Sequence, residues 1–333
     1  MIDKRQDIVD NILKDKLFAD NTSVKSRSSK AIIKNSNIGF SIDITGLVLA
    51  EAESVRMRII DQIKALQIFD KINIVLTSSS NSQPQSKKEK PKLHIKGVKQ
   101  VLLIASGKGG VGKSTITALV AYMLKSMGKK VGIVDADIYG PSIPNIFALQ
   151  GKPELENDRM IPLANYGIAI NSIGFLIKPN SSVSWRGPMA SKALYQLLSL
   201  TDWGELDYLI IDSPPGTGDI HLSILENYIV NQVLMVTTPQ KISKIDVSRA
   251  INLYQKFDIP ITGIIENMSY YINPINNEKI SIFSGNSGVA LSQSFNLPLI
   301  TTIPMNPQLS KACDKGENLE KFCHLVHKVH AFL

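Results

Sequence analysis

The sequence is poor in cysteine and in long apolar runs, and each shortage excludes a class of protein. Its 333 residues include two cysteines, Cys313 and Cys323, which excludes a disulfide-stapled secreted scaffold and every zinc module built on four cysteines. No apolar run approaches the roughly 18–20 residues that span a bilayer. No signal-type apolar core follows the charged start. We therefore expect a cytoplasmic protein with no membrane partner.

The positive charge is concentrated in the first third of the chain. The net charge is +8, yet residues 1–100 contain 18 Lys and Arg against 11 Asp and Glu, whereas residues 101–333 contain 19 against 18. Four of the lysines lie between positions 87 and 92, with no aromatic residues among them to stack on bases. A solvated linker explains this run better than a nucleic-acid site, and we expect no nucleic-acid partner.

Composition and periodicity predict two domains. Residues 78–96 are polar and rich in lysine, which is typical of a linker. Before them, the hydrophobic period predicts a small α+β domain over residues 1–77, with helices over 7–18 and 51–69 and strands over 38–49 and 71–77. This region shows no constellation of catalytic groups.

Residues 97–333 have the pattern of an α/β fold. Short, nearly continuous apolar runs lie at 101–105, 131–134, 208–211, 233–236 and 261–265. They alternate with helical stretches at about 113–127, 189–200, 243–257 and 287–295. Strands buried on both faces and separated by helices predict a doubly wound, mostly parallel sheet.

A phosphate-binding loop follows the first of these strands. The pattern G-x-x-x-x-G-K-[ST] is complete and lies between a predicted strand and a predicted helix, as this loop requires. Glycines let backbone N–H groups face the phosphates, the lysine reaches the β- and γ-phosphates, and the serine is a ligand of Mg²⁺. The nucleotide-binding residues are Gly107, Lys108, Gly109, Gly110, Val111, Gly112, Lys113, Ser114 and Thr115.

Acidic residues end the next two predicted strands of this sheet. Asp135 and Asp137 follow the second strand, where one carboxylate would hold a Mg²⁺-bound water and the other would orient the attacking water. Asp212 follows four apolar residues, as in a Walker B strand, and would hold Mg²⁺. Gly216, in the Pro-Pro-Gly loop that follows, would offer its N–H to a γ-phosphate. We therefore predict a P-loop nucleoside triphosphatase with Ser114, Asp135 and Asp212 at its Mg²⁺ site.

Lys108, early in the loop, gives the sequence a resemblance to a known class of ATPases. K-G-G-x-G-K-[ST] is the deviant phosphate loop, which resembles that of MinD, ParA and the nitrogenase iron protein. SGKGGVGKST, VDADIYGPSIP, WRGPM, WGELDYLIIDSPPGTGD and ENMSY then occur in the order found in Mrp/ApbC-type iron–sulfur cluster carriers. The resemblance is dense over about residues 97–316. Over residues 1–77 it is weak and suggests a degenerate iron–sulfur assembly-factor domain.

The resemblance implies a dimeric ATPase that binds a [4Fe–4S] cluster and transfers it to apoproteins, working with iron–sulfur assembly factors. It implies that Lys108 reaches the nucleotide of the other subunit of a homodimer. It also gives Asp137 the water-positioning role and Asn267 a hydrogen bond to adenine. Lys108, Lys113, Asp137 and Asp212 are then the catalytic residues.

The sequence departs from this family at its cluster ligands. The family has a C-x-x-C just after the Asn-Met-Ser-Tyr stretch, where this chain has Asn273 and Asn276. Asparagine is a poor ligand for cluster iron, which is bound by thiolate as a rule. We expect Cys313 in a loop and Cys323 on the apolar stripe of a last helix over 319–333, as a small core residue. The cluster ligands are left unassigned.

Three functions are therefore compared. The first is an ATP-hydrolysing carrier of iron–sulfur clusters, which the match over the whole ATPase region favours. The second is a dimeric, ATP-dependent scaffold of cluster assembly that binds no cluster itself, which the missing C-x-x-C favours. The third is a positioning ATPase like MinD or ParA, which the near-neutral charge of residues 101–333 disfavours.

Overall fold

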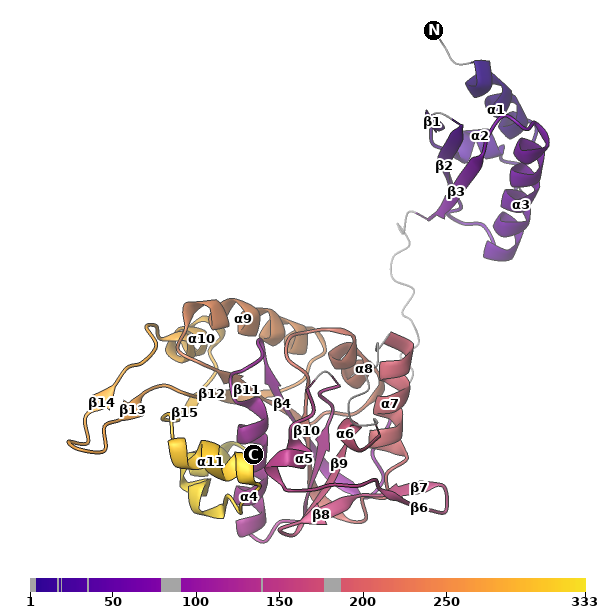
Figure 1. Ribbon diagram of the computed structural model, residues 1–333. Helices are drawn as coiled ribbons and strands as arrows, with labels where there is room; N and C mark the ends of the chain where they lie inside the picture. The colour runs from indigo at the N-terminus through magenta and orange to yellow at the C-terminus, as the bar shows by residue number, and fades with distance from the viewer. Residues whose placement is uncertain are drawn as a thin grey trace. The chain divides into compact units, whose positions relative to one another are not determined.

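The computed structural model describes residues 4–16, 18, 20–34, 36–78, 91–138, 140–176 and 187–333 (Figure 1). The chain divides into two compact units, Met1–Glu89 and Lys90–Leu333. Most of the expected linker, over 79–90, and the start of the WRGPM motif lie outside the described residues.

The first unit is a small α+β fold. Its elements are α1 (Lys4–Lys14), α2 (Val24–Arg27), β1 (Ile32–Lys34), β2 (Asn37–Asp43), α3 (Leu49–Ala65) and β3 (Lys71–Thr77). β1 is antiparallel to β2, and β2 is parallel to β3, which makes β2, α3 and β3 a strand–helix–strand unit. The core includes Phe40 and Ile42 from β2 and Val55, Ile59 and Ile63 from one face of α3.

The strand that the alternation predicts over 38–49 is shorter in the structure. β2 ends at Asp43, because the Asp43 carboxylate accepts the backbone N–H of Thr45 at 2.9 Å and turns the chain. The chain then passes directly to α3, which begins at Leu49.

The second unit is built on one eight-stranded sheet. Its order is β15-β12-β11-β4-β10-β5-β9-β8, and all neighbours are parallel except β8 and β9. The strands are β4 (Val98–Ser106), β5 (Val131–Asp135), β8 (Leu163–Asn165), β9 (Ile168–Ser172), β10 (Leu206–Asp212), β11 (Gln232–Thr237), β12 (Ile261–Glu266) and β15 (Leu299–Thr302). The mostly parallel sheet predicted from the apolar runs is confirmed.

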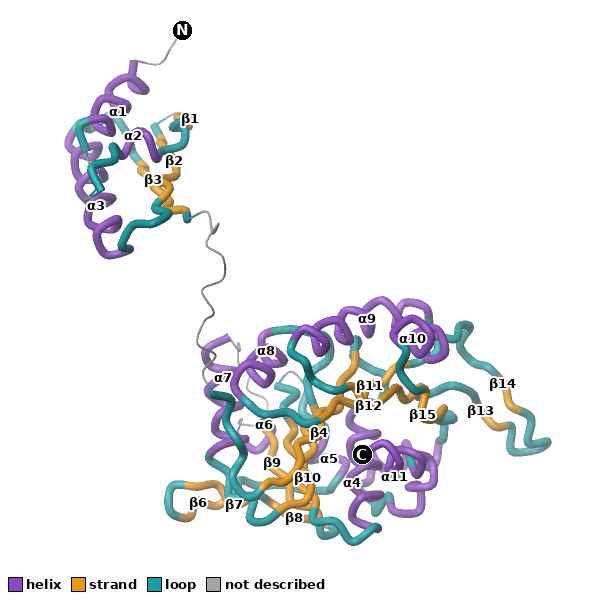
Figure 2. Tube along the Cα trace, turned by 180° about the vertical axis from the view of Figure 1, so that it is seen from behind, coloured by secondary structure: helices purple, strands orange, loops and turns teal. Residues whose placement is uncertain are grey.

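Helices cover both faces of this sheet (Figure 2). One face packs against α4 (Lys113–Ser126), α5 (Ile143–Ile146), α11 (Pro307–Lys315) and two 3₁₀ helices at Glu320–Leu325 and His327–Phe332. The other packs against α7 (Gly187–Ser199), α8 (Asp219–Asn227), α9 (Lys241–Lys256) and α10 (Ser287–Phe295), and α6 (Ile173–Leu176) follows β9. Because β4 is buried on both faces, Leu102 and Leu103 lie in different cores.

The chain order of the strands places a ligand site at the end of β4. The chain passes from β4 to β5 and β10 on one side of β4, and then to β11 and β12 on the other side. Such a reversal opens a crevice at the carboxyl ends of the strands. The phosphate loop at 107–112 follows β4 at this point.

Several segments differ from the sequence-based expectation. Residues 90–96, which we expected to be linker, belong to the second unit, and Leu93 pairs with Tyr228 there. Cys313 lies in α11 instead of a loop, because Asn306 caps this helix through the N–H groups of Gln308 and Leu309. Two antiparallel hairpins were not predicted, β6 (Glu154–Glu156) with β7 (Arg159–Ile161), and β13 (Tyr271–Ile272) with β14 (Lys279–Ile280).

The last segment is helical but not α-helical. The expected helix over 319–333 forms two 3₁₀ helices, and Cys323 is partly buried, with its thiol 3.9 Å from the Leu119 carbonyl oxygen. The apolar stripe still packs on the core, because its members recur every three or four residues, namely Leu319, Phe322, Val326 and Val329. No helix among the described residues is both long and apolar enough to cross a membrane.

Candidate functional site

The phosphate loop takes a shape that glycine makes accessible. Gly110 and Gly112 have φ angles of +78° and +83°, in the left-handed region that side chains with a Cβ disfavour. A Cβ on Gly107 would lie 2.3 Å from the backbone nitrogen of Val247 in α9. Gly112 then passes directly into α4, so the loop amides and the helix N-terminus face one space.

Lys113 is the cation at the base of this loop. Its side chain is 6 % exposed, and its Nζ lies 2.8 Å from Oδ1 of Asp212 and 4.0 Å from Oδ2 of Asp137. This ion pair lacks hydrogen-bond geometry, and among the described residues no acceptor takes a proton from Nζ. A buried ammonium with unused donors fits the phosphate oxygens of a nucleotide.

Asp212 accepts hydrogen bonds from two hydroxyl groups of α4. Its carboxylate is fully buried and accepts hydrogen bonds from Ser114 Oγ at 2.6 Å and Thr117 Oγ1 at 2.7 Å. Mg²⁺ prefers hard oxygen ligands and keeps several waters, so one hydroxyl and one carboxylate beside a phosphate site suit it. Ser114 and Asp212 therefore fit the Mg²⁺ site that the sequence predicts.

The two aspartates at the carboxyl end of β5 have different surroundings. Asp135 is fully buried and accepts the N–H groups of Asp137 and Ile143 at 3.2 Å each and the Ser172 hydroxyl at 3.1 Å. Burial, and then the charge of Asp212, raise the pKa of Asp135 to about 8. Asp137 lines the nucleotide-sized cavity, and among the residues that the structure describes Asp135 does not. Asp135 holds the loop that presents Asp137.

The cavity beside the loop has a volume of about 710 Å³, within the range of small-molecule sites. Lys108, Lys113 and Asp137 lie on its phosphate side. The sequence reasoning missed another part of the wall. It comes from the end of α5 and the residues after it and from the end of α11, namely Ile146, Ala148, Leu149, Gln150, Cys313, Asp314 and Lys315. No sequence motif identifies these two segments, because they are distant from the phosphate loop in the chain and adjoin it only after folding.

Gly216 and Asn267 each donate a hydrogen bond to the backbone at the phosphate loop. The Gly216 N–H donates to the Ser106 carbonyl at 3.0 Å. Asn267 is buried at the end of β12, and its Nδ2 donates to the Val111 carbonyl at 2.9 Å. Both residues therefore brace the phosphate loop, and neither is among the described residues that line the cavity.

The positions of the family's cysteines lie in the turn of a hairpin. β13 and β14 project from the body of this unit (Figure 1). Asn273 Oδ1 accepts the N–H of Ile275 at 2.9 Å, and Asn276 Oδ1 accepts the N–H of Glu278 at 3.1 Å. Both asparagines thus stabilise local turns. No group of three or more His, Cys, Asp or Glu side chains in the described part of the chain is placed to hold a metal ion.

The two thiols are poorly suited to ionise. Burial raises the pKa of Cys313, against the smaller opposite effect of a hydrogen bond with Thr115 in the first turn of α4. Burial raises the pKa of Cys323 to about 11. Since thiolates are the metal ligands, both thiols would have to lose their protons to bind iron.

Comparison with known families decides the assignment. Residues 97–330 match the family model described as "ParA: NUBPL iron-transfer P-loop NTPase". The chain belongs to this family. It is therefore a P-loop NTPase, which agrees with the phosphate loop, Lys113 and Asp212 as the structure places them.

The relatives and solved structures agree with that assignment. The chain is 53% identical over 317 residues to the "Iron-sulfur cluster carrier protein" of Rickettsia felis, covering 95% of this chain and 93% of that protein. It is 41% identical over 233 residues to the mouse "Iron-sulfur cluster transfer protein NUBPL", covering 69% of this chain and 72% of that protein.

Two solved structures resemble the fold of the second unit. A nucleotide-binding protein from Archaeoglobus fulgidus in complex with ADP has a TM-score of 0.61 and 36% identity, covering 68% of this chain and 89% of that chain. The MinD-containing complex from Aquifex aeolicus has a TM-score of 0.50 and 21% identity, covering 70% of this chain and 94% of that chain, and it shows the fold alone. The P-loop architecture predicted from the sequence is confirmed.

Proposed function

We propose that this protein is an ATP-hydrolysing carrier that binds iron–sulfur clusters and transfers them to apoproteins. Its family and the names of its relatives support cluster transfer. The observation that supports the ATPase is the contact of two buried side chains, Lys113 and Asp212, with the half-buried Ser114 hydroxyl beside the phosphate loop.

In the proposed hydrolysis, the chain binds and orients MgATP. The loop amides at 107–112 and Lys113 hold the β- and γ-phosphates, and Ser114 and Asp212 would hold Mg²⁺. The Mg²⁺ would neutralise charge that develops on the phosphate oxygens. Asp137, which lines the cavity, orients the attacking water, while Asp135 fixes the Asp137 backbone.

The site as described lacks a second cation on the far side of the transferred γ-phosphate. Lys108 lines the cavity, and in the proposed homodimer it reaches the nucleotide of the partner. Cooperation of two loops would couple ATP hydrolysis to rearrangement of the dimer, and so to loading or release of the cluster. The proposed partners are apo iron–sulfur proteins and assembly factors in the cytoplasm, without nucleic acid or membrane.

A specific observation favours a second function, a dimeric ATP-dependent scaffold that carries no cluster. Asn273 and Asn276 are committed to turns where the family has its cysteines, and both thiols of the chain have raised pKa values. A thiolate-bound cluster in this chain must use Cys313, Cys323 or both, because the sequence holds no other cysteine.

Anaerobic reconstitution with iron and sulfide separates the two functions. The carrier function predicts a cluster with the visible absorption of iron–thiolate bonds, and its loss in the Cys313→Ala/Cys323→Ala variant. A wild-type chain that takes up no cluster, although it hydrolyses ATP, would contradict the carrier and support the scaffold. A chain that does not hydrolyse ATP would contradict both.

A second variant tests the hairpin itself. Asn273→Cys/Asn276→Cys places two thiols at C-x-x-C spacing and should raise the amount of cluster bound per chain. Ile275→Cys/Asn276→Cys is the matched control, since it adds two thiols to the same turn at another spacing. Equal gains in both variants would show that spacing in this hairpin does not matter.

A further inference from the structure

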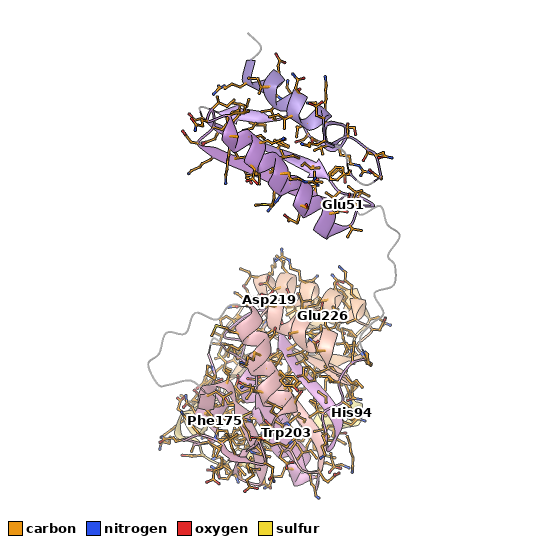
Figure 3. The ribbon with its side chains drawn as sticks, turned by 90° about the vertical axis from the view of Figure 1, so that its right-hand side faces the viewer. Glu51, His94, Phe175, Trp203, Asp219 and Glu226 are labelled. Atoms are coloured by element: carbon orange, nitrogen blue, oxygen red, sulfur yellow. The ribbon has the colours of Figure 1, made fainter. Side chains whose placement is uncertain are left out.

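A buried histidine lies behind the loop that follows Asp212. His221 is in the first turn of α8, the helix that carries the labelled Asp219 and Glu226 in Figure 3. It is fully buried, and its Nε2 lies 2.8 Å from the Pro214 carbonyl oxygen. Its Nδ1 lies 2.8 Å from the hydroxyl of Tyr254, a fully buried residue of α9.

The partners fix the protonation of the ring. A carbonyl oxygen only accepts, so Nε2 carries a proton and donates it to Pro214. Nδ1 then accepts from the Tyr254 hydroxyl, which leaves the imidazole neutral. Burial lowers the pKa of His221 to about 4, so the ring stays neutral under physiological conditions. Every polar atom of the ring is thus engaged by a defined partner.

The hydrogen bonds of His221 connect the loop after Asp212 with α9. Pro214 stands between Asp212, which accepts a hydrogen bond from Ser114, and Gly216, which donates one to Ser106 just before the phosphate loop. The neighbouring Pro215 lines the nucleotide cavity. We refer to residues 213–218 as the Pro-Pro-Gly loop.

The helix that holds Tyr254 also touches the phosphate loop. α9 approaches Gly107 so closely that a Cβ there would lie 2.3 Å from the Val247 nitrogen. Tyr254 lies two turns further along the same helix. α9 therefore contacts the phosphate loop directly and the Pro-Pro-Gly loop through His221.

We propose that His221, oriented by Tyr254, is a positioning residue that fixes the Pro-Pro-Gly loop against the phosphate loop for hydrolysis. The proposal rests on the ATPase proposed above. His221 does not line the cavity formed by the described residues, so it acts through Pro214 and the adjoining Asp212 and Gly216. Loss of its bond to Pro214 should lower kcat and leave the KM for ATP nearly unchanged, because Lys113 and the loop amides hold the phosphates.

Two amide substitutions separate this role from simple core packing. The His221→Gln side chain places an amide near the position of Nε2 and keeps the donor to Pro214. The His221→Asn side chain places its amide near Nδ1 and keeps a partner for Tyr254 but loses the donor. Both are neutral and polar, so each is the control for the other.

Steady-state ATP hydrolysis by the full chain is the test. We expect kcat to fall about tenfold or more in His221→Asn, as for a lost buried hydrogen bond, and to stay within about threefold of wild type in His221→Gln. An equal fall in both variants, an unchanged kcat in both, or a change confined to KM would overturn the proposal.

If the variants fail to fold, a spectroscopic measurement on the wild-type chain still tests the proposal. In wild type, nitrogen NMR should show one histidine that remains neutral from pH 8 to pH 5 with its proton on Nε2. A proton on Nδ1, or titration of every histidine in that range, would overturn the proposal. This measurement needs no turnover, so a wild-type chain that is inactive would contradict the proposed ATPase and still leave the His221 geometry decided.

Discussion

Buried charge dominates the site at the scale of single residues. Lys113 and Asp212 are buried and form an ion pair, and the Asp212 carboxylate also accepts hydrogen bonds from the hydroxyl groups of Ser114 and Thr117. An ion pair of this kind contributes little net stability, because desolvation offsets the attraction. Its value is that a nucleotide phosphate meets a prearranged cation.

Lys113→Ala should lower ATP affinity between about tenfold and a hundredfold, since it removes charge-assisted hydrogen bonds to phosphate. Titration calorimetry measures the change. Lys99→Ala is the control, because that lysine is exposed and pairs with Asp207. Unchanged affinity in Lys113→Ala would show that the phosphates bind elsewhere.

His221 also predicts how stability depends on pH. Its pKa is lowered from the ordinary 6.5 to about 4, so between these values the unfolded chain binds a proton that the folded chain does not. The free energy of unfolding should therefore fall as pH falls through this window, by up to about 3 kcal/mol from this residue. Denaturant unfolding of His221→Gln should show a shallower fall. Parallel curves for variant and wild type would contradict the buried neutral ring.

Motifs in the sequence identify some residues of the site, whereas the roles of others are visible only in the structure. Lys113, Ser114 and Asp212 follow from motifs, because their spacing is local to one loop or strand. The brace that Asn267 gives to Val111 depends on a contact between distant segments. Asp135 supports the Asp137 backbone locally, but its carboxylate is also held by the Ser172 hydroxyl of β9, which is distant in the chain. The bond from His221 to Pro214 spans seven residues, but its partner Tyr254 lies on another helix and carries no motif.

At the scale of elements, the strands of the sheet and α9 fix the position of the phosphate loop. The apolar runs predict β4, β5, β10, β11 and β12, because strands covered on both faces are apolar throughout. The edge strands β8 and β15 and the hairpin β13–β14 escape this pattern, since each of these strands is only two to four residues long. The 3₁₀ form of the last segment is also not visible in its apolar spacing.

The contact of the phosphate loop with α9 can be tested by substitution. Gly107→Ala should destabilise the chain by about 1–3 kcal/mol and weaken ATP binding, because the methyl group would meet the backbone of Asp246 and Val247, which cannot rotate away. Gly218→Ala is the control, since a Cβ there meets nothing within 4 Å. Thermal unfolding and nucleotide titration give the two quantities. Equal behaviour of the two variants would contradict this packing.

At the scale of the whole molecule, one unit supplies all the described residues of the nucleotide site. Every described residue that lines the cavity belongs to Lys90–Leu333, and the phosphate loop, Asp137 and the end of α11 meet there. The sequence predicts the small α+β unit and the ATPase unit from composition and period. It does not place residues 90–96 with the second unit, because Leu93 pairs with the distant Tyr228.

The proposed homodimer makes a prediction at this scale. Light scattering should show a shift from monomer to dimer when the chain binds Mg²⁺ and a non-hydrolysable ATP analogue. Lys108→Ala should weaken this shift, because it removes the cation proposed to reach the partner's nucleotide, whereas Lys99→Ala should not. A Lys108→Ala chain that dimerises and hydrolyses ATP like wild type would refute the role across the dimer.

Cluster transfer tests the central claim most directly. The reconstituted chain is mixed anaerobically with an apo-ferredoxin, and cluster acquisition by the acceptor is followed by circular dichroism with and without MgATP. We predict transfer by wild type that responds to MgATP, and transfer without this response by Lys113→Ala. An acceptor that gains no cluster from the wild-type chain, or gains it equally with and without MgATP, would contradict an ATP-dependent carrier.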